Sequence, residues 1–201
     1  MRLAHLNLPS DFQYSVSPLM IAIVAVLVFI LPSDWQTALV YARFEIDNGA
    51  AYRLLTGHFV HTNLWHLSFN LFGLALLWAL HGEYYRWQSI LIFSVCTMLL
   101  IAYALYLFSP HLFEYVGLSG YLHALFAWGA VQDIRRKMTS GYILLLGLII
   151  KLVNEQIFGA GNLMPQLIDA QVAINSHLFG AIVGFGYAAA SVFMPHTQSK
   201  A

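Results

Sequence analysis

The sequence predicts an all-α polytopic membrane protein built as a bundle of six transmembrane helices. Of its 201 residues, 60% are hydrophobic and 9% are charged, whereas a soluble domain carries roughly a quarter charged residues. Six segments are long and apolar enough to be helices in lipid, at residues 13–31, 64–81, 89–109, 118–132, 141–158 and 173–194. They occupy residues 1–201 as a single membrane domain, with neither an internal repeat nor a soluble domain.

Composition also excludes several kinds of partner and site. The formal net charge is zero and the longest basic run is Arg135-Arg136-Lys137, so no basic surface for nucleic acid is expected. Cys96 is the only cysteine, which excludes an internal disulfide and a thiolate metal site. His58, His61 and His66 lack a carboxylate or thiolate to complete a metal site. We therefore expect no metal site at these histidines.

The first apolar stretch and the connector after it are both expected to associate with the bilayer. Residues 18–31 are followed by Pro32-Ser33-Asp34 in place of a small-residue cleavage site, which favours a retained anchor over a cleaved signal. The connector 32–63 contains several aromatic side chains, Trp35, Tyr41, Phe44 and Tyr52 among them. It is interpreted either as an interfacial element or as an ordinary loop.

The distribution of Lys and Arg predicts the orientation. Six lie on the side of the N-terminus, the 2–3 and 4–5 loops and the C-terminal tail, namely Arg2, Arg86, Arg135, Arg136, Lys137 and Lys200, whereas Arg43 and Arg53 lie on the other side. By the positive-inside rule, both termini are expected in the cytoplasm, and the 1–2, 3–4 and 5–6 loops face outward.

The fourth span is too short to cross the bilayer. Ser119 precedes Arg135 by 16 residues, or about 24 Å of helix, against a hydrocarbon core of about 30 Å. The loop 115–118 must then expose backbone groups below the membrane surface, which is tolerated only beside protein or a watery cavity. A hydrated pocket at Ser119 is therefore predicted.

Two more polar side chains are predicted at the same depth, and a third is predicted one turn deeper. His177 lies 18 residues before Pro195, His66 lies 16 residues before Gly82, and Asn70 is one turn deeper than His66. A serine hydroxyl needs a nearby base to become a nucleophile, and imidazole can serve. The pattern predicts Ser119 as nucleophile and His177 as base, with His66, Asn70 and the Ser119 N–H as oxyanion donors.

Small residues predict which helices carry this pair. Gly180 and Gly184 form a small-xxx-small pattern beyond His177, which lets another helix approach closely, and the span bearing Ser119 and Gly120 is the expected neighbour. The second, fourth and sixth spans contain no Asp or Glu. The expectation is therefore a Ser-His dyad without a third, acidic member.

These motifs together resemble the rhomboid family. The matching pieces are the Gly-x-Ser-Gly stretch 117–120, the His61-His66-Asn70 spacing, the run His177-Leu178-Phe179-Gly180-Ala181-Ile182-Val183-Gly184, and the aromatic-Arg pair Tyr52-Arg53. The resemblance covers roughly residues 50–190 and implies a six-helix rhomboid-like bundle, open toward the outer side, that works as an intramembrane serine protease. It implies neither a metal nor a cofactor. By this resemblance, Ser119 and His177 are catalytic, His66 and Asn70 stabilise the oxyanion, and Gly117, Gly120 and Gly180 support them.

The chain size and the run 56–63 are most similar to rhombosortases. That similarity implies removal of C-terminal Gly-Gly anchoring tails from exported proteins, hence membrane-anchored substrates with a C-terminal transmembrane tail. It also implies a bacterial inner membrane with the active site open to the periplasmic side. The alternative is a non-catalytic rhomboid-like protein that binds membrane-anchored clients.

Two features are not settled by the resemblance. Many rhomboids carry Tyr one turn after the serine, packed against the catalytic His, where this chain has His123. The packing or protonation of His177 is expected to differ as a result. His123 is alternatively a supporting hydrogen-bond partner, which is favoured over a direct part in catalysis. Lys151 and Glu155, four residues apart in the fifth span, are expected to form an intrahelical ion pair, and they are also candidates for lining a lateral substrate gate.

Overall fold

Helices form nearly all of the secondary structure in residues 8–190, the part of the chain that the computed structural model describes. The long helices are α1 (Phe12–Phe29), α5 (Leu64–His81), α6 (Trp87–Phe108), α7 (Ser119–Arg135), α8 (Thr139–Phe158) and α10 (Ile174–Ala190). Each coincides with one predicted segment. Residues 191–194, the end of the sixth predicted span, lie outside the described residues.

Length separates these helices into two groups. Within residues 8–190, α1, α5 with the turn up to Tyr84, α6 and α8 are long and apolar enough to cross a membrane. Helix α7 has 17 residues, as does the described part of α10. The structure thus confirms an all-α membrane protein and a short helix beginning at Ser119.

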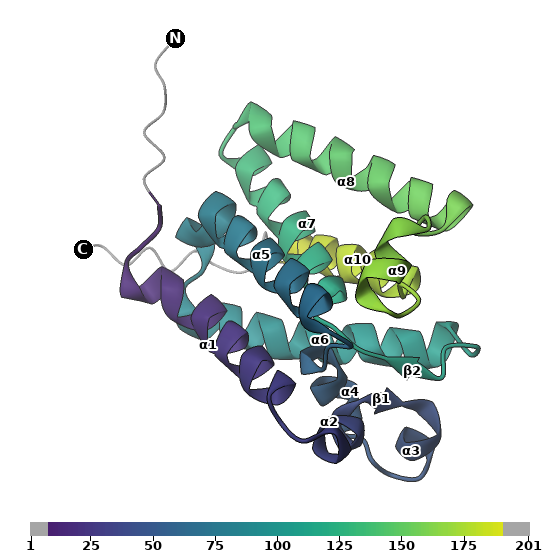
Figure 1. Ribbon diagram of the computed structural model, residues 1–201. Helices are drawn as coiled ribbons and strands as arrows, with labels where there is room; N and C mark the ends of the chain where they lie inside the picture. The colour runs from purple at the N-terminus through teal and green to yellow at the C-terminus, as the bar shows by residue number, and fades with distance from the viewer. Residues whose placement is uncertain (1–7, 191–201) are drawn as a thin grey trace.

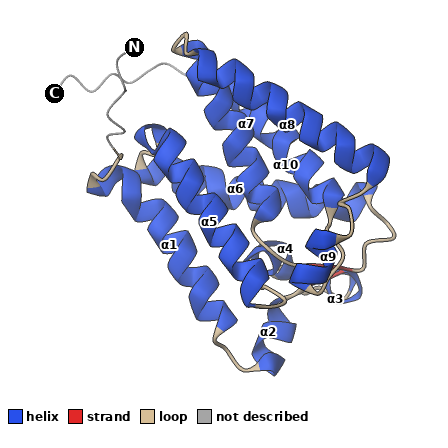
Figure 2. Ribbon diagram, turned by 45° about the horizontal axis from the view of Figure 1, so that its top comes forward, coloured by secondary structure: helices blue, strands red, loops and turns tan. Residues whose placement is uncertain are grey.

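Helices α7 and α10 run through the middle of the bundle, with α1 and α8 on opposite sides (Figures 1 and 2). Nine residues of α7 are buried, and most of them are small or aromatic, whereas only three residues of α8 are buried. The outward face of α8 is apolar and exposes Ile143, Leu146, Ile149, Ile150 and Val153. An exposed apolar face of this kind suits contact with lipid.

The crossing of α7 and α10 is very close because small residues meet there. A Cβ atom on Gly180 would overlap the carbonyl oxygen of Gly120, and one on Gly184 would overlap that of Ala124. Small residues at such positions let two helix backbones approach closely in membranes. The predicted packing of the serine-bearing helix against Gly180 and Gly184 is confirmed.

The connector 32–63 is a folded element rather than an ordinary loop. It contains α2 (Ser33–Leu39), β1 (Tyr41–Ala42), α3 (Arg43–Asp47), α4 (Arg53–Thr56) and the 3-10 turn η1 (Gly57–Phe59). Strand β1 pairs antiparallel with β2 (Glu114–Tyr115), with Tyr41 opposite Tyr115. This pairing ties the connector to the segment that leads into α7. Its position on the bilayer surface stays a prediction.

Two arginines hold the connector in place through backbone carbonyls. Arg53 donates to the carbonyls of Thr37 and Val40 at 2.9 and 2.8 Å. Arg43 donates to carbonyls at and beyond the C-terminal end of α6, those of Leu105, Tyr106, Ser109 and Leu112. A cation at a helix C-terminus also complements the helix dipole. The two remaining short elements are η2 (Gly82–Tyr84) and α9 (Leu163–Ile168).

The crossing predicts opposite effects for two glycine substitutions on α10. Gly184→Ala should lower the free energy of unfolding in detergent by about 1–3 kcal/mol, because the new methyl group has no room against Ala124. Gly186→Ala is the matched control, since nothing lies within 4 Å of its Cβ position, and it should be neutral or stabilising by about 0.5–1 kcal/mol. Equal effects in thermal or denaturant unfolding would contradict the close crossing.

Candidate active site

Ser119 and His177 meet where the N-terminal ends of α7 and α10 come together. Ser119 is the first residue of α7, and His177 lies in the first turn of α10. The Ser119 Oγ is 3.0 Å from the His177 Nε2, and His177 is buried. This distance is that of a hydrogen bond, which a serine nucleophile and its base require.

His66 and Asn70 lie on the same face of α5, against the segment just before Ser119. Gly117 has a φ of +105°, and a Cβ atom there would sit 2.5 Å from the His66 Nε2 and 3.6 Å from the Asn70 Nδ2. Glycine is therefore required both by the backbone conformation and by the space that His66 occupies. Both side chains are buried.

Neighbouring groups orient His66 and Asn70. The His66 Nδ1 is 3.4 Å from the Thr62 backbone nitrogen and 3.1 Å from the Thr62 Oγ1, which leaves Nε2 facing Gly117. When Nδ1 accepts the Thr62 N–H, the ring proton is on Nε2 and can be donated. The Asn70 Nδ2 uses one hydrogen on the His66 carbonyl, at 3.0 Å, and an amide nitrogen has a second hydrogen.

Two cavities reach Ser119. One of about 550 Å³ extends from Ser119 and His66 past the β2 segment to α2, and the other, of about 330 Å³, lies among α5, α7, α8 and α10. They share the side chains of His66, Ser119, Ile168 and Val172. A pocket is therefore present at Ser119, as the short fourth span predicted, and Ser119 lines both of its cavities.

Helix α9 covers this pocket and is fastened to the start of α5. The Asn63 side chain donates to the Leu167 carbonyl at 2.9 Å, and the Thr62 hydroxyl donates to the Ile168 carbonyl. Met164 and Ile168 from α9 line the smaller cavity. The segment between α8 and α10 thus forms one wall of the site.

A carboxylate contacts His177, contrary to expectation. The Glu155 Oε2 lies 2.9 Å from the His177 Nδ1, and Oε1 lies 3.1 Å from it. The expectation of no acidic partner was wrong because it considered only the second, fourth and sixth spans, and Glu155 reaches His177 from the fifth. The predicted ion pair is confirmed, with the Lys151 Nζ 2.7 Å from the Glu155 Oε1.

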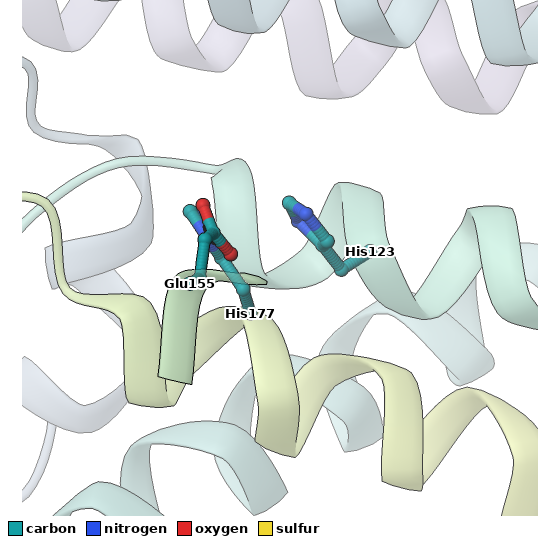
Figure 3. A group of neighbouring side chains, drawn as sticks. All are labelled: His123, Glu155 and His177. Atoms are coloured by element: carbon teal, nitrogen blue, oxygen red, sulfur yellow. Dashed lines mark hydrogen bonds and ion pairs between the residues drawn. The ribbon is translucent and has the colours of Figure 1, made fainter. Parts of the chain in front are cut away.

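His123 packs flat against His177. The ring centroids are 4.1 Å apart with an interplanar angle of 14°, and the His123 Nδ1 donates to the Ser119 carbonyl at 2.7 Å. Figure 3 shows His177 with Glu155, and His123 beside them on α7. His123 therefore packs on His177 and also hydrogen-bonds to the backbone of Ser119.

His123, Glu155 and His177 are close enough to raise the question of a metal ion, with one ligand atom from each within 4.8 Å of the others. Nitrogen lone pairs lie in the plane of the imidazole ring, so two nearly parallel rings stacked 4.1 Å apart hold their lone pairs in separate, nearly parallel planes that do not meet at one ion. The Nδ1 atoms already contact Ser119 and Glu155. This geometry does not fit the tetrahedral convergence that zinc requires.

Beneath the Gly117 turn, His58 and Tyr115 form a buried support. The His58 Nε2 donates to the Met98 carbonyl at 2.8 Å, and its Nδ1 is 3.2 Å from the Tyr115 hydroxyl, which donates to the Gly117 carbonyl at 2.8 Å. Burial lowers the pKa of His58 to about 4. This pair fixes the turn that leads into Ser119. Sequence reasoning missed the pair, for which the only signal was the polarity of His58.

We compared the sequence with models of known protein families. A family model described as the Rhomboid domain matches residues 48–192. The chain belongs to the rhomboid family. Members of this family are generally intramembrane serine proteases, and the matched region of this rhomboid protein contains the whole site from His58 to His177. A comparison with curated proteins finds no significant match.

The buried histidines predict how the stability of this rhomboid protein depends on pH. Burial lowers the pKa of His58 to about 4 in the folded state, against 6.5 ordinarily. Between pH 6.5 and pH 4, His58 is therefore protonated in the unfolded state but neutral in the folded state. The free energy of unfolding should therefore fall between pH 6.5 and pH 4, by on the order of 3 kcal/mol for this group.

In the His58→Gln variant, the free energy of unfolding should fall less steeply between pH 6.5 and pH 4 than in wild type. Some loss remains because burial and the nearby His66 lower the pKa of His61 to about 3. Unfolding measured in detergent at pH 4, 5, 6 and 7 checks this, and parallel curves for variant and wild type would contradict it.

Proposed function

We propose that this rhomboid protein is an intramembrane serine endopeptidase that uses Ser119 as nucleophile and His177 as general base. The observation that carries the proposal is the 3.0 Å contact between the Ser119 Oγ and the His177 Nε2. It occurs at a cavity and beside two polar side chains, His66 and Asn70, that can donate hydrogen bonds. Family membership gives the same reaction class.

The proposed reaction is acyl transfer in two steps. The Ser119 Oγ attacks the carbonyl carbon while its proton passes to the His177 Nε2, and the C=O electron pair moves onto oxygen. The intermediate collapses, the C–N bond breaks, and Nε2 returns the proton to the leaving nitrogen. Water then attacks the acyl-enzyme by the same route, with His177 again taking and returning the proton.

The oxyanion would be held by donors converging beside Gly117. Ser119 begins α7, so its N–H has no partner within the helix and lies at the positive end of the helix dipole. The His66 Nε2 and the free hydrogen of the Asn70 amide supply the other donors. Donors held in place before the reaction cost no reorganisation in the transition state.

An apolar groove offers a path for a substrate helix. It measures about 310 Å³, lies between α5 and α8 over α7, and ends at His123 and Lys151 beside the site. Its walls are hydrocarbon, from Leu76, Leu77, Leu122, Phe126 and Leu148, with Gly73 and Gly147 leaving space. The substrates proposed are therefore membrane-anchored proteins, cut in or beside their transmembrane segment.

The resemblance to rhombosortases supports a more specific class of substrate. We propose that the substrates are exported proteins carrying a C-terminal Gly-Gly tail with a transmembrane anchor, since small residues let a helical segment unwind and present its carbonyl. The chain would reside in a bacterial inner membrane, with both termini cytoplasmic and the site open to the periplasmic side, as the Lys and Arg distribution predicts.

Reaction with a fluorophosphonate probe tests the nucleophile. Purified protein in detergent should be labelled once, on Ser119, and Ser119→Ala should abolish labelling, while His177→Ala should slow it by at least about 10³-fold because the hydroxyl loses its base. Ser89→Ala, at an exposed hydroxyl on α6, is the matched control and should label as wild type does.

A non-catalytic rhomboid-like binder of membrane-anchored clients makes the opposite prediction. Such a protein needs no activated hydroxyl, so the probe would leave Ser119 unlabelled while clients still co-purify. Labelling that persists in Ser119→Ala would equally contradict the proposed nucleophile.

Co-expression with a tailed substrate tests the cleavage specificity. Mass measurement of the substrate should show trimming at the Gly-Gly motif in cells with wild-type protein and none in cells with Ser119→Ala. Replacing both glycines of the tail with Leu should reduce trimming at least about tenfold, which corresponds to about 1.4 kcal/mol. Equal trimming of both tails would exclude the Gly-Gly preference while leaving the peptidase intact.

A further inference from the structure

We infer that Glu155 is a positioning residue that makes the catalytic pair a Ser-His-Glu triad, an inference that rests on the proposed peptidase function. Glu155 comes from α8, a helix that contributes neither the nucleophile nor the base, and it reaches His177 on the ring nitrogen opposite to Ser119. Figure 3 shows Glu155 and His177 meeting at this point.

The contact decides which nitrogen of His177 carries the proton. An ionised carboxylate can only accept hydrogen bonds, so with Oε2 at 2.9 Å and Oε1 at 3.1 Å the His177 Nδ1 is the donor. A neutral imidazole then has its lone pair on Nε2, the atom that faces the Ser119 Oγ at 3.0 Å. In this tautomer Nε2 can accept the serine proton, and in the other it cannot.

Glu155 also compensates the charge that forms during catalysis. When the serine proton moves to Nε2, the ring becomes an imidazolium whose Nδ1–H already points at the carboxylate. The proton stays on nitrogen and Glu155 remains ionised throughout. In a largely buried site such a pair interacts more strongly than in water, and the Glu155 side chain is only 12% exposed.

The charged and titratable groups facing His177 come from two elements besides its own. Lys151 and Glu155 lie on α8, with the Lys151 Nζ 3.5 Å from the His177 Nδ1, and His123 stacks on the ring from α7. An ammonium cannot accept a hydrogen bond, so Lys151 does not compete for the Nδ1 proton. Its contact with the Glu155 Oε1 at 2.7 Å favours the ionised carboxylate.

The position of Glu155 is unfavourable for helix α8 itself. It lies in the last turn, since α8 ends at Phe158, and a negative charge there opposes the helix dipole. The order of the Lys151–Glu155 ion pair along the helix is also the less stabilising one. Glu four residues before Lys stabilises a helix better than Lys four residues before Glu. Helix stability alone therefore does not account for a carboxylate here, whereas the contact with His177 does.

Steady-state kinetics on a transmembrane peptide substrate test the inference. Glu155→Gln keeps the shape but presents an amide that can donate to Nδ1 and favour the wrong tautomer. It should lower kcat by about 10²- to 10⁴-fold while KM stays within about threefold. Glu83→Gln makes the same change in an exposed ion pair, the one with Arg136 away from the site, and as the matched control its kcat should stay within about fivefold of wild type.

Chemical rescue separates positioning from structural support. Glu155→Ala leaves a space beside Nδ1, and formate added to this variant should raise kcat at least about tenfold by supplying a carboxylate. Formate should not change the Glu83→Gln or Ser119→Ala variants. If Glu155→Gln fails to fold, the double variant Lys151→Met plus Glu155→Gln replaces it, because it leaves no unpaired charge in the helix. Its kcat should fall to the same extent.

The inference is overturned if Glu155→Gln and the double variant retain kcat within about fivefold of wild type, or if the control Glu83→Gln loses as much as Glu155→Gln. It is also overturned if formate leaves a folded Glu155→Ala variant inactive. Failure of the peptidase function itself is a different result, in which wild-type protein neither cleaves the peptide nor labels at Ser119.

Discussion

The close crossing of α7 and α10 brings the two members of the catalytic pair, Ser119 and His177, together. Gly180 and Gly184 let α10 lie against the carbonyl oxygens of Gly120 and Ala124, and at this separation the Ser119 Oγ and the His177 Nε2 are within hydrogen-bond distance. A larger residue at either glycine would move α10 away and break that contact first. The other parts of the site, the Gly117 turn, His66 and the α9 cover, are arranged around this fixed pair.

The polar groups of the site are concentrated in one place within an otherwise apolar bundle. Most face the interior of the bundle and have partners, as with Glu155 and His177 or His58 and Met98, whereas the outer faces of α1 and α8 are apolar. Polar groups at depth in a membrane are costly unless paired or beside a cavity. Their presence here, next to two cavities, marks the region where chemistry can occur.

Much of this arrangement could be predicted from the sequence, because membrane spans are easily located and residues can be counted from their ends. Counting placed Ser119, His177 and His66 at one depth, and the small-residue pattern identified α7 and α10 as neighbours. The contact between Glu155 and His177 was missed because counting gives depth and not the rotation of a helix. A signal did exist, since two charges in the apolar fifth span, Lys151 and Glu155, required an explanation. The fold of residues 32–63 could not be predicted, because it depends on distant contacts such as Tyr41 with Tyr115.

The central claim is that the Ser119 hydroxyl and the His177 Nε2 act on one substrate carbonyl. A peptidyl chloromethyl ketone tests it directly, since Ser119 adds to the ketone carbon and His177 Nε2 then displaces chloride to form a C–N bond. Mass mapping of the treated protein should place the adduct on His177, and Ser119→Ala should prevent it. An adduct elsewhere, or one on His177 that forms equally in Ser119→Ala, would contradict the account.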